Sequence, residues 1–146
     1  MVRVENGIIT QEVNILVQPP DNYYWSLCTD IHRITAKDTL NSPSFAQVWH
    51  QIVPYIDNQN VVAHNGFGFD FPVLNATLNY YNLPTPDYNK FCTYKICTSN
   101  FAILCEEHNI QLNHHDALSD AQVCAELYLF YRNKKENYET YETSKF

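Results

Sequence analysis

The stretch NVVAHNGFGFDFPVL, residues 60–74, combines a short apolar strand, a loop and the start of a helix. Residues 60–64 form a short segment with an apolar centre that contains two β-branched valines, as expected of a buried parallel strand. The loop that follows contains two glycines, and Asp70 then opens a segment in which apolar residues recur at helical spacing. Pro72 is compatible with the first turn of that helix, where a backbone N–H would have no partner. A strand that leads through a loop into a helix predicts an α/β fold.

A β-hairpin is expected at the start of the chain, over residues 2–10. Its turn is placed at Asn6 and Gly7, because Asn-Gly tolerates the positive φ angles of tight hairpin turns. From residue 9 to residue 18, apolar and polar residues alternate until Pro19 stops the pattern. This alternation predicts a half-buried antiparallel strand.

Further elements are expected from similar patterns along the chain. They are an irregular connection at 21–43, a helix at 45–56 capped by Ser44, a helix opened by Asp70 with Phe71, Leu74, Leu78 and Tyr81 on one face, a short strand at 90–97, a short helix at 101–107 and a long helix at 119–132. Strands that alternate with helices after a hairpin predict an α/β fold with a mixed sheet. We expect one domain over residues 1–132 and a polar C-terminal tail at residues 133–146.

The composition limits the class of protein. Of 146 residues, 45% are hydrophobic and 14% aromatic, which is typical of a packed globular domain. No apolar run is long enough to span a bilayer. The five cysteines form no C-x-x-C pair, so we expect a reduced, cytoplasmic protein without disulfides or structural zinc. The formal charge of −7 argues against a protein that wraps a long nucleic-acid duplex around itself. It is compatible with an enzyme that binds a strand end through metal ions.

Two carboxylates stand where helices are expected to begin. Asp70 follows the carboxyl end of a strand, which is where ligands bind in α/β sheets. Asp120 lies near the start of the long C-terminal helix, with His115 five residues before it. Each aspartate could instead serve only as a helix N-cap, and His115 alone could be a surface histidine. Together they predict metal-assisted hydrolysis, because carboxylates suit Mg²⁺ or Mn²⁺ and a neutral histidine can take a proton from water.

These residues lie in two segments that resemble the second and third motifs of DEDDh 3′–5′ exonucleases. The first segment runs from VVAHN to FD, residues 61–70, and the second is H-x-A-L-x-D-A, residues 115–121. The spacing N-G-x-x-F-D-F-P-x-L is similar to that of the three-prime repair exonucleases within the family. IHRIT, residues 31–35, resembles the IHGIT stretch of proteins like the epsilon subunit of DNA polymerase III, with arginine in place of glycine. The resemblance covers residues 2–131.

The resemblance implies a ribonuclease H-like sheet flanked by helices and a role for each matched residue. Asp70 and Asp120 would bind two divalent ions, Mg²⁺ or Mn²⁺, and His115 would act as the general base. His64 and Asn65 would lie near the substrate. The implied reaction releases nucleoside 5′-monophosphates from the 3′ end of single-stranded DNA or RNA, as in proofreading or DNA repair. The implied partners are a nucleic-acid 3′ end and a DNA polymerase or a second copy of the chain, with no membrane.

The family's first motif, Asp-x-Glu on the central strand of the sheet, does not occur in this sequence. Neither Glu5 nor Glu12 has an aspartate two residues before it. We therefore expect the first, central strand and most of the second to be missing through a lost N-terminus, which leaves strand edges unpaired. Two carboxylates in place of four leave a two-ion site under-coordinated, so we expect little or no nuclease activity from this chain.

Two other interpretations are open. A catalytically inactive module that binds nucleic acid or another protein would account for the absent Asp-x-Glu motif. Retention of His115 and both aspartates argues against it, since an inactive site requires none of them. The third interpretation is an acidic structural domain with coincidental motifs. The agreement of two motifs with their expected strand and helix contexts argues against that interpretation.

Overall fold

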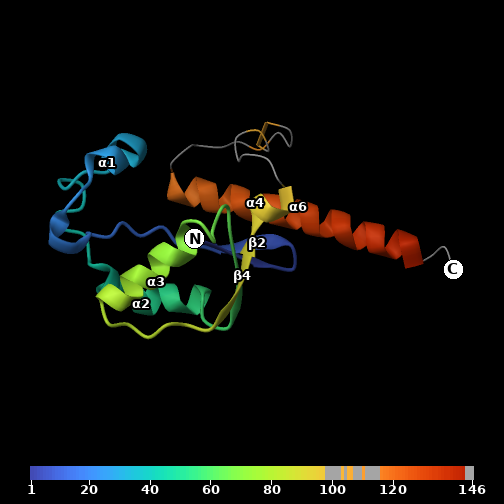
Figure 1. The fold of residues 1–146 in the computed structure, drawn as a ribbon, viewed down its shortest axis with the longest axis horizontal. Helices are drawn as coiled ribbons and strands as arrows, with labels where there is room; N and C mark the ends of the chain where they lie inside the picture. Colours follow the sequence, from blue (N-terminus) through green and yellow to red (C-terminus); the bar gives the residue numbers. More distant parts are fainter. Residues whose placement is uncertain (98–102, 104, 107–109, 111–115, 144–146) are drawn as a thin grey trace.

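A computed structural model describes residues 1–97, 103, 105–106, 110 and 116–143 of the chain. The elements, drawn in Figure 1, are β1 (Val2–Glu5), β2 (Ile8–Glu12), the 3-10 turn η1 (Pro20–Asn22), α1 (Ser26–His32), α2 (Phe45–Ile52), the 3-10 turn η2 (Val53–Tyr55), β3 (Gln59–Ala63), α3 (Asp70–Tyr80), β4 (Tyr88–Cys92), α4 (Thr93–Cys97) and α6 (Ala117–Thr143). The predicted α/β fold is confirmed.

The described strands form two separate two-stranded sheets. β1 pairs antiparallel with β2, and β3 pairs parallel with β4, with Ala63 opposite Cys92. Helix α6 contacts β1, β2 and β3, so one helix supports both sheets (Figure 1). Antiparallel and parallel pairs are both present, as expected of a mixed α/β fold, but the described strands do not join into one sheet. Because β3 has a partner on one side only among the described residues, its residues 61–63 are half-buried and not fully buried as predicted.

The opening hairpin follows the prediction at its turn and departs from it along its second strand. Asn6 and Gly7 have φ angles of 53° and 80°, which are the positive values that the Asn-Gly pair tolerates. The strand β2 ends at Glu12, whereas the sequence predicts a strand that continues to residue 18. Residues 13–18 stay extended and keep the alternation of burial, but β1 is too short to pair with them beyond Val13.

The connection at residues 21–43 contains a helix that the sequence did not predict. Helix α1 has no buried residue and stands apart from α2 and α3 (Figure 1). It starts after Trp25 without a side-chain cap and ends at Arg33, whose φ of 59° is left-handed. A fully buried Thr39 secures the connection, since its hydroxyl group donates to Asn22 Oδ1 at 3.0 Å and lies 2.7 Å from the Tyr24 hydroxyl.

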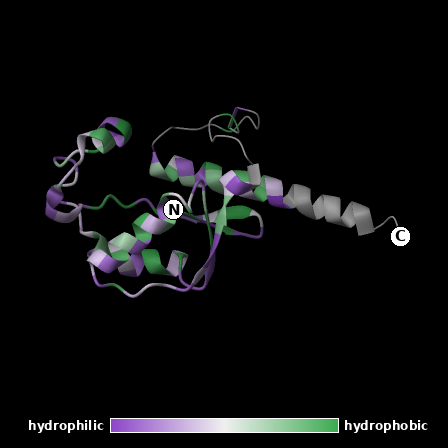
Figure 2. Ribbon diagram, viewed as in Figure 1, coloured by the Kyte–Doolittle hydropathy of each residue, from purple (hydrophilic) through white to green (hydrophobic). Residues whose placement is uncertain are grey.

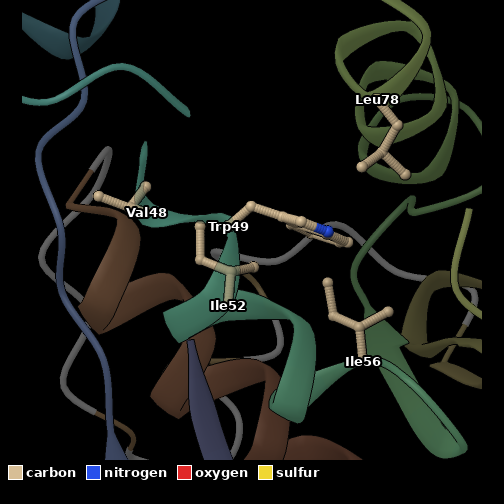
Figure 3. Packing of buried hydrophobic residues seen from close by; sticks show 5 residues of the cluster. All are labelled: Val48, Trp49, Ile52, Ile56 and Leu78. Carbon is tan, nitrogen blue, oxygen red and sulfur yellow. The ribbon is translucent and has the colours of Figure 1, made fainter. Parts of the chain in front are cut away.

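Helix α2 carries most of the main core. Its first turn is held by Ser44, whose backbone N–H donates to Gln47 Oε1 at 2.7 Å, and this confirms the predicted start. The α-helix ends at Ile52 and not at residue 56, because Pro54 has no N–H to donate and the chain tightens into η2. The core residues, from α2, its exit and α3, are shown in Figure 3: Val48, Trp49, Ile52, Ile56 and Leu78.

Helix α3 begins at Asp70, as predicted. Phe71 and Leu78 are buried, Leu74 packs against the core, and Tyr81 stacks on Phe45 with ring centroids 6.3 Å apart. The predicted apolar face is therefore confirmed. In Figure 2 hydrophobic residues occur along both α2 and α3, whereas η1 is hydrophilic.

The C-terminal third differs from the prediction in its boundaries. The predicted strand at 90–97 is divided into β4 and the short helix α4, and most of the predicted helix at 101–107 lies outside the described residues. Helix α6 begins two residues before the predicted start and continues through residue 132 to Thr143. A second cluster packs Val123 and Leu127 of α6 on Cys105. No helix among the described residues is long and apolar enough to cross a membrane.

Candidate active site

The parallel strands β3 and β4 end at the same edge of their sheet, because Ala63 is in register with Cys92. This is the edge at which α/β proteins bind ligands. His64 and the loop to residue 69 follow β3, while Thr93 and helix α4 follow β4 directly. The register therefore brings two segments that are about thirty residues apart in sequence to one place.

His64 is tied to this edge and, through it, to α6. Its Nδ1 lies 2.9 Å from the hydroxyl group of Thr93, a fully buried residue, and that hydroxyl lies 3.8 Å from Cys124 Sγ on α6. The imidazole meets the Tyr94 ring edge-on, with centroids 5.6 Å apart. Burial lowers the pKa of His64, and the neighbouring Asp70 carboxylate offsets part of that effect. The geometry therefore favours a neutral, oriented imidazole.

The loop after His64 folds back on itself. Asn65 has a left-handed φ of 56°, and its carbonyl oxygen accepts hydrogen bonds from the backbone N–H groups of Gly68 at 2.9 Å and Phe69 at 3.1 Å. The Gly66 carbonyl accepts from the Phe71 N–H at 2.9 Å. These bonds link the loop to the first turn of α3 and fix the position of Asp70 relative to the strand.

Replacing Gly66 with alanine is expected to lower the free energy of unfolding by about 1–3 kcal/mol. A Cβ at Gly66 would lie 2.7 Å from the Ala63 Cβ and 2.8 Å from Cε2 of Phe71, so the loop and the helix would have to move apart. Gly68→Ala is the matched control, because its new Cβ would meet only the Asn65 side chain, which can rotate. Urea denaturation measures the free energy of unfolding of both variants. Equal losses in Gly66→Ala and Gly68→Ala would contradict the packing argument.

Asp70 does not cap its helix. The cap position of α3 is Phe69, no side chain provides a cap hydrogen bond, and Asp70 stands in the first turn. The interpretation of Asp70 as an N-cap is therefore wrong. Desolvation raises the pKa of the Asp70 carboxyl group, although the backbone N–H of the same residue and His64 act in the opposite direction. Asp70 is thus a solvent-exposed carboxylate near a histidine, with a pKa raised by partial desolvation.

The cap of α6 is Asp116, so the interpretation of Asp120 as an N-cap is wrong. Asp116 Oδ1 accepts a hydrogen bond from the Ser119 N–H at 2.8 Å, so Ser119 and Asp120 both lie inside the helix. Asp120 is half-buried in the first turn. Burial raises the pKa of the Cys105 thiol, and the charges of Asp120 and Glu126 act in the same direction. His115 lies outside the described residues.

The structure brings some of the predicted site residues together. His64 and Asp70 influence each other's charge, and Asn65 lies between them in the loop. Asp120 lies on α6, which contacts β3 and α4. Within the described part of the chain, no group of three or more His, Cys, Asp or Glu side chains is arranged to hold a metal ion.

Two residues at this edge were not predicted from the sequence. Thr93 orients His64, and the Cys92 thiol is buried at the end of β4. Burial would raise the pKa of this thiol, but the backbone N–H groups of residues 65, 66, 94 and 95 outweigh it and lower the pKa. No sequence signal identifies these residues, because their roles depend on the β3–β4 register.

Lowering the pH is expected to destabilise the folded chain through His64. A histidine with a lowered pKa binds fewer protons when folded, so its contribution is complete above about pH 6.5 and is lost as the pH falls through the folded-state value. Between about pH 7.5 and about pH 5.5, the free energy of unfolding should therefore fall more for the wild type than for His64→Gln, as measured by urea denaturation. Equal losses would exclude His64 as the titrating group.

An α/β domain with carboxylates on helices that follow its strands is an arrangement found in nucleases that use divalent cations. The family model described as Exonuclease (RNase_T) matches residues 1–128. The chain belongs to this exonuclease family, and its motifs are those of the DEDDh type.

Particular relatives agree with this assignment. The chain is 28% identical over 145 residues to the DNA polymerase III subunit epsilon of Escherichia coli (strain K12), covering 88% of this chain and 58% of that protein. It is 29% identical over 114 residues to the epsilon subunit of Buchnera aphidicola subsp. Baizongia pistaciae (strain Bp), covering 68% of this chain and 46% of that protein. The chain thus spans about half the length of these relatives.

A solved structure has a similar fold. Exonuclease X in complex with 5′ overhanging duplex DNA superposes with a TM-score of 0.66 at 25% identity, over 91% of this chain and 80% of that one. The similarity supports the ribonuclease H-like fold implied by the motifs.

Proposed function

We propose that this chain is a 3′–5′ exonuclease domain that hydrolyses nucleic acid from the 3′ end to nucleoside 5′-monophosphates. The observation that carries the proposal is Asp70. It matches the aspartate of the second motif that the sequence resembles, opens a helix at the carboxyl end of a strand, and is not used as a cap. The DNA bound by Exonuclease X supports a nucleic-acid substrate. Similarity to polymerase subunits supports a polymerase as a partner.

The chemistry of the proposed ligands suits a divalent cation. Asp70 and Asp120 offer carboxylate oxygens, which Mg²⁺ and Mn²⁺ prefer. Desolvation of Asp70 disfavours its negative charge, and a bound cation would compensate for that cost. Bound cations would supply a reactive water and stabilise the leaving 3′ oxygen.

The remaining site residues act through proton transfer and positioning. His115 is the proposed general base, which accepts a proton from the attacking water. His64 is held by Thr93 in a fixed orientation beside Asp70, and Asn65 shapes the loop, so both would border the substrate. These roles follow from the motif positions together with the contacts of His64 and Asn65.

We further propose that the chain alone has little activity. The sequence has no Asp-x-Glu motif, and two carboxylates are too few to hold two cations tightly. The alternative function, an inactive module that binds nucleic acid or protein, is favoured by one observation. The sequence lacks the Asp-x-Glu motif, whose two carboxylates are metal ligands in the family that the chain resembles.

Release of mononucleotides from a single-stranded DNA in Mn²⁺ tests both functions. We expect slow release by the wild type, and a further reduction of about 10²–10⁴-fold in His115→Ala, because a general base contributes about that factor. His50→Ala, an exposed histidine on α2, is the control. Rapid release by the wild type would contradict the low activity. Binding without release, insensitive to chelators, would select the inactive module.

A further inference from the structure

Aromatic side chains and a lysine are exposed beside the candidate site. Phe67, in the loop before Asp70, is 44% exposed, and Tyr94, in the first turn of α4, is 48% exposed. Lys95 follows Tyr94 and is also exposed. Its ammonium group lies 4.1 Å from the centroid of the Phe67 ring. A loop after β3 and a helix after β4 thus meet through a cation and an aromatic ring.

The position of this pair relative to Asp70 is fixed. Phe67 also packs edge-on against Phe71, with ring centroids 5.3 Å apart, and Phe71 is buried in the first turn of α3. The hydrogen bond from the Phe71 N–H to the Gly66 carbonyl joins the same loop to the helix. Phe67 therefore cannot move far from Asp70 without disturbing the start of α3.

Two of the nine Lys and Arg residues of the chain, which carries a formal charge of −7, contact aromatic rings here. Besides Lys95, Lys90 on β4 places its ammonium group 5.7 Å from the Phe71 ring centroid and 5.2 Å from the Tyr88 ring centroid. Aromatic rings interleaved with cations are the features by which proteins bind single-stranded nucleic acid, through base stacking and phosphate attraction.

We propose that Phe67 and Lys95 bind an unpaired nucleotide of a single-stranded nucleic acid beside the candidate active site. The inference rests on the proposed function and adds a binding site to it. A base stacked on an aromatic ring is held more strongly than an exposed ammonium group on the same ring. On binding, a base stacks on Phe67, and the Lys95 ammonium group moves from the ring to the adjacent phosphate.

The experiment measures binding of the full chain to a fluorescein-labelled single-stranded oligonucleotide by fluorescence anisotropy. A chelator is present, so that neither metal nor cleavage contributes. Phe67→Ala is expected to raise Kd about tenfold, and Phe67→Trp to retain binding because the aromatic face is kept. Lys95→Gln is expected to raise Kd several-fold and to reduce the salt dependence by about one phosphate contact.

Matched controls lie on the connection at residues 21–43. Tyr23→Ala removes an aromatic ring that is 71% exposed, and Lys37→Gln removes an exposed cation; both should leave Kd within about twofold of the wild type. An oligonucleotide with abasic 3′ nucleotides should bind the wild type and Phe67→Ala almost equally. Circular dichroism confirms that each variant is folded.

The outcomes separate this inference from the proposed function. If the wild type binds single strands but Phe67→Ala and Lys95→Gln bind equally well, the Phe67–Lys95 site is wrong and the exonuclease proposal stands. Equal losses in the variants and in the controls would also overturn the site. If the wild type binds no single strand in the presence of the chelator, the Phe67–Lys95 site is wrong, whereas the exonuclease proposal is decided by the release of mononucleotides in Mn²⁺.

Discussion

In a Mn²⁺ titration, Asp70→Asn is expected to lose most of the stabilisation that the cation gives to the wild type. A cation at a hundred times its Kd raises the free energy of unfolding by about 2.7 kcal/mol, whereas a variant with a hundredfold higher Kd gains only about 0.4 kcal/mol. Without metal, Asp70→Asn should change the free energy of unfolding little, because Asp70 is exposed and the desolvation of its carboxylate is opposed by the backbone N–H and His64. Thermal unfolding with and without Mn²⁺ measures both effects.

Asp30→Asn provides the control for this experiment, because Asp30 is an exposed carboxylate on α1, a helix with no buried residue. It should respond to Mn²⁺ like the wild type. Asp120→Asn is expected to behave like Asp70→Asn if both carboxylates bind the cation. Equal Mn²⁺ stabilisation of the wild type and Asp70→Asn would remove Asp70 from the metal site.

Leu78→Ala is expected to lower the free energy of unfolding by about 2–5 kcal/mol. Leu78 is fully buried on α3 and completes the core formed by Trp49 and Ile56 (Figure 3). Truncation removes apolar contacts and leaves a cavity that the neighbouring helix α2 cannot fill without moving. Urea denaturation monitored by tryptophan fluorescence measures the loss.

Val73→Ala on the same helix is the matched control. Val73 is 46% exposed, so its truncation should change the free energy of unfolding by no more than about 0.5 kcal/mol. A similar loss in both variants would contradict burial as the cause of the Leu78 effect, since alanine has the higher helix propensity at both positions.

Local patterns predicted the central part of the fold well. The Asn6–Gly7 turn, the start of α2 at Ser44 and the face of α3 all depend on neighbours within a few residues in sequence. Helix α1 could not be predicted in this way, because it buries no residue and so shows no apolar stripe. The predicted start of α6 at Ser119 was wrong, because the residue that accepts the capping hydrogen bond is Asp116.

The candidate site was predicted only in part, because sequence patterns report on near neighbours in the chain and not on contacts made by the fold. Sequence spacing identified Asp70 as the residue that opens a helix after a strand. It could not predict the desolvation of Asp70 or its proximity to His64, because both depend on how the loop folds. Thr93 has no local signal at all, since its contact with His64 exists only through the parallel pairing of β3 and β4. His115 and its role stay a prediction.

Helix α6 determines which parts of the chain can open independently. It contacts both two-stranded sheets, its side chain Gln122 donates to Glu12 at 2.6 Å, and its Cys124 lies against Thr93. Neither sheet can separate from α6 without exposing apolar residues of the helix. We therefore expect the two sheets and the first half of α6 to behave as one cooperative unit in amide hydrogen exchange, and α1 to exchange by local opening.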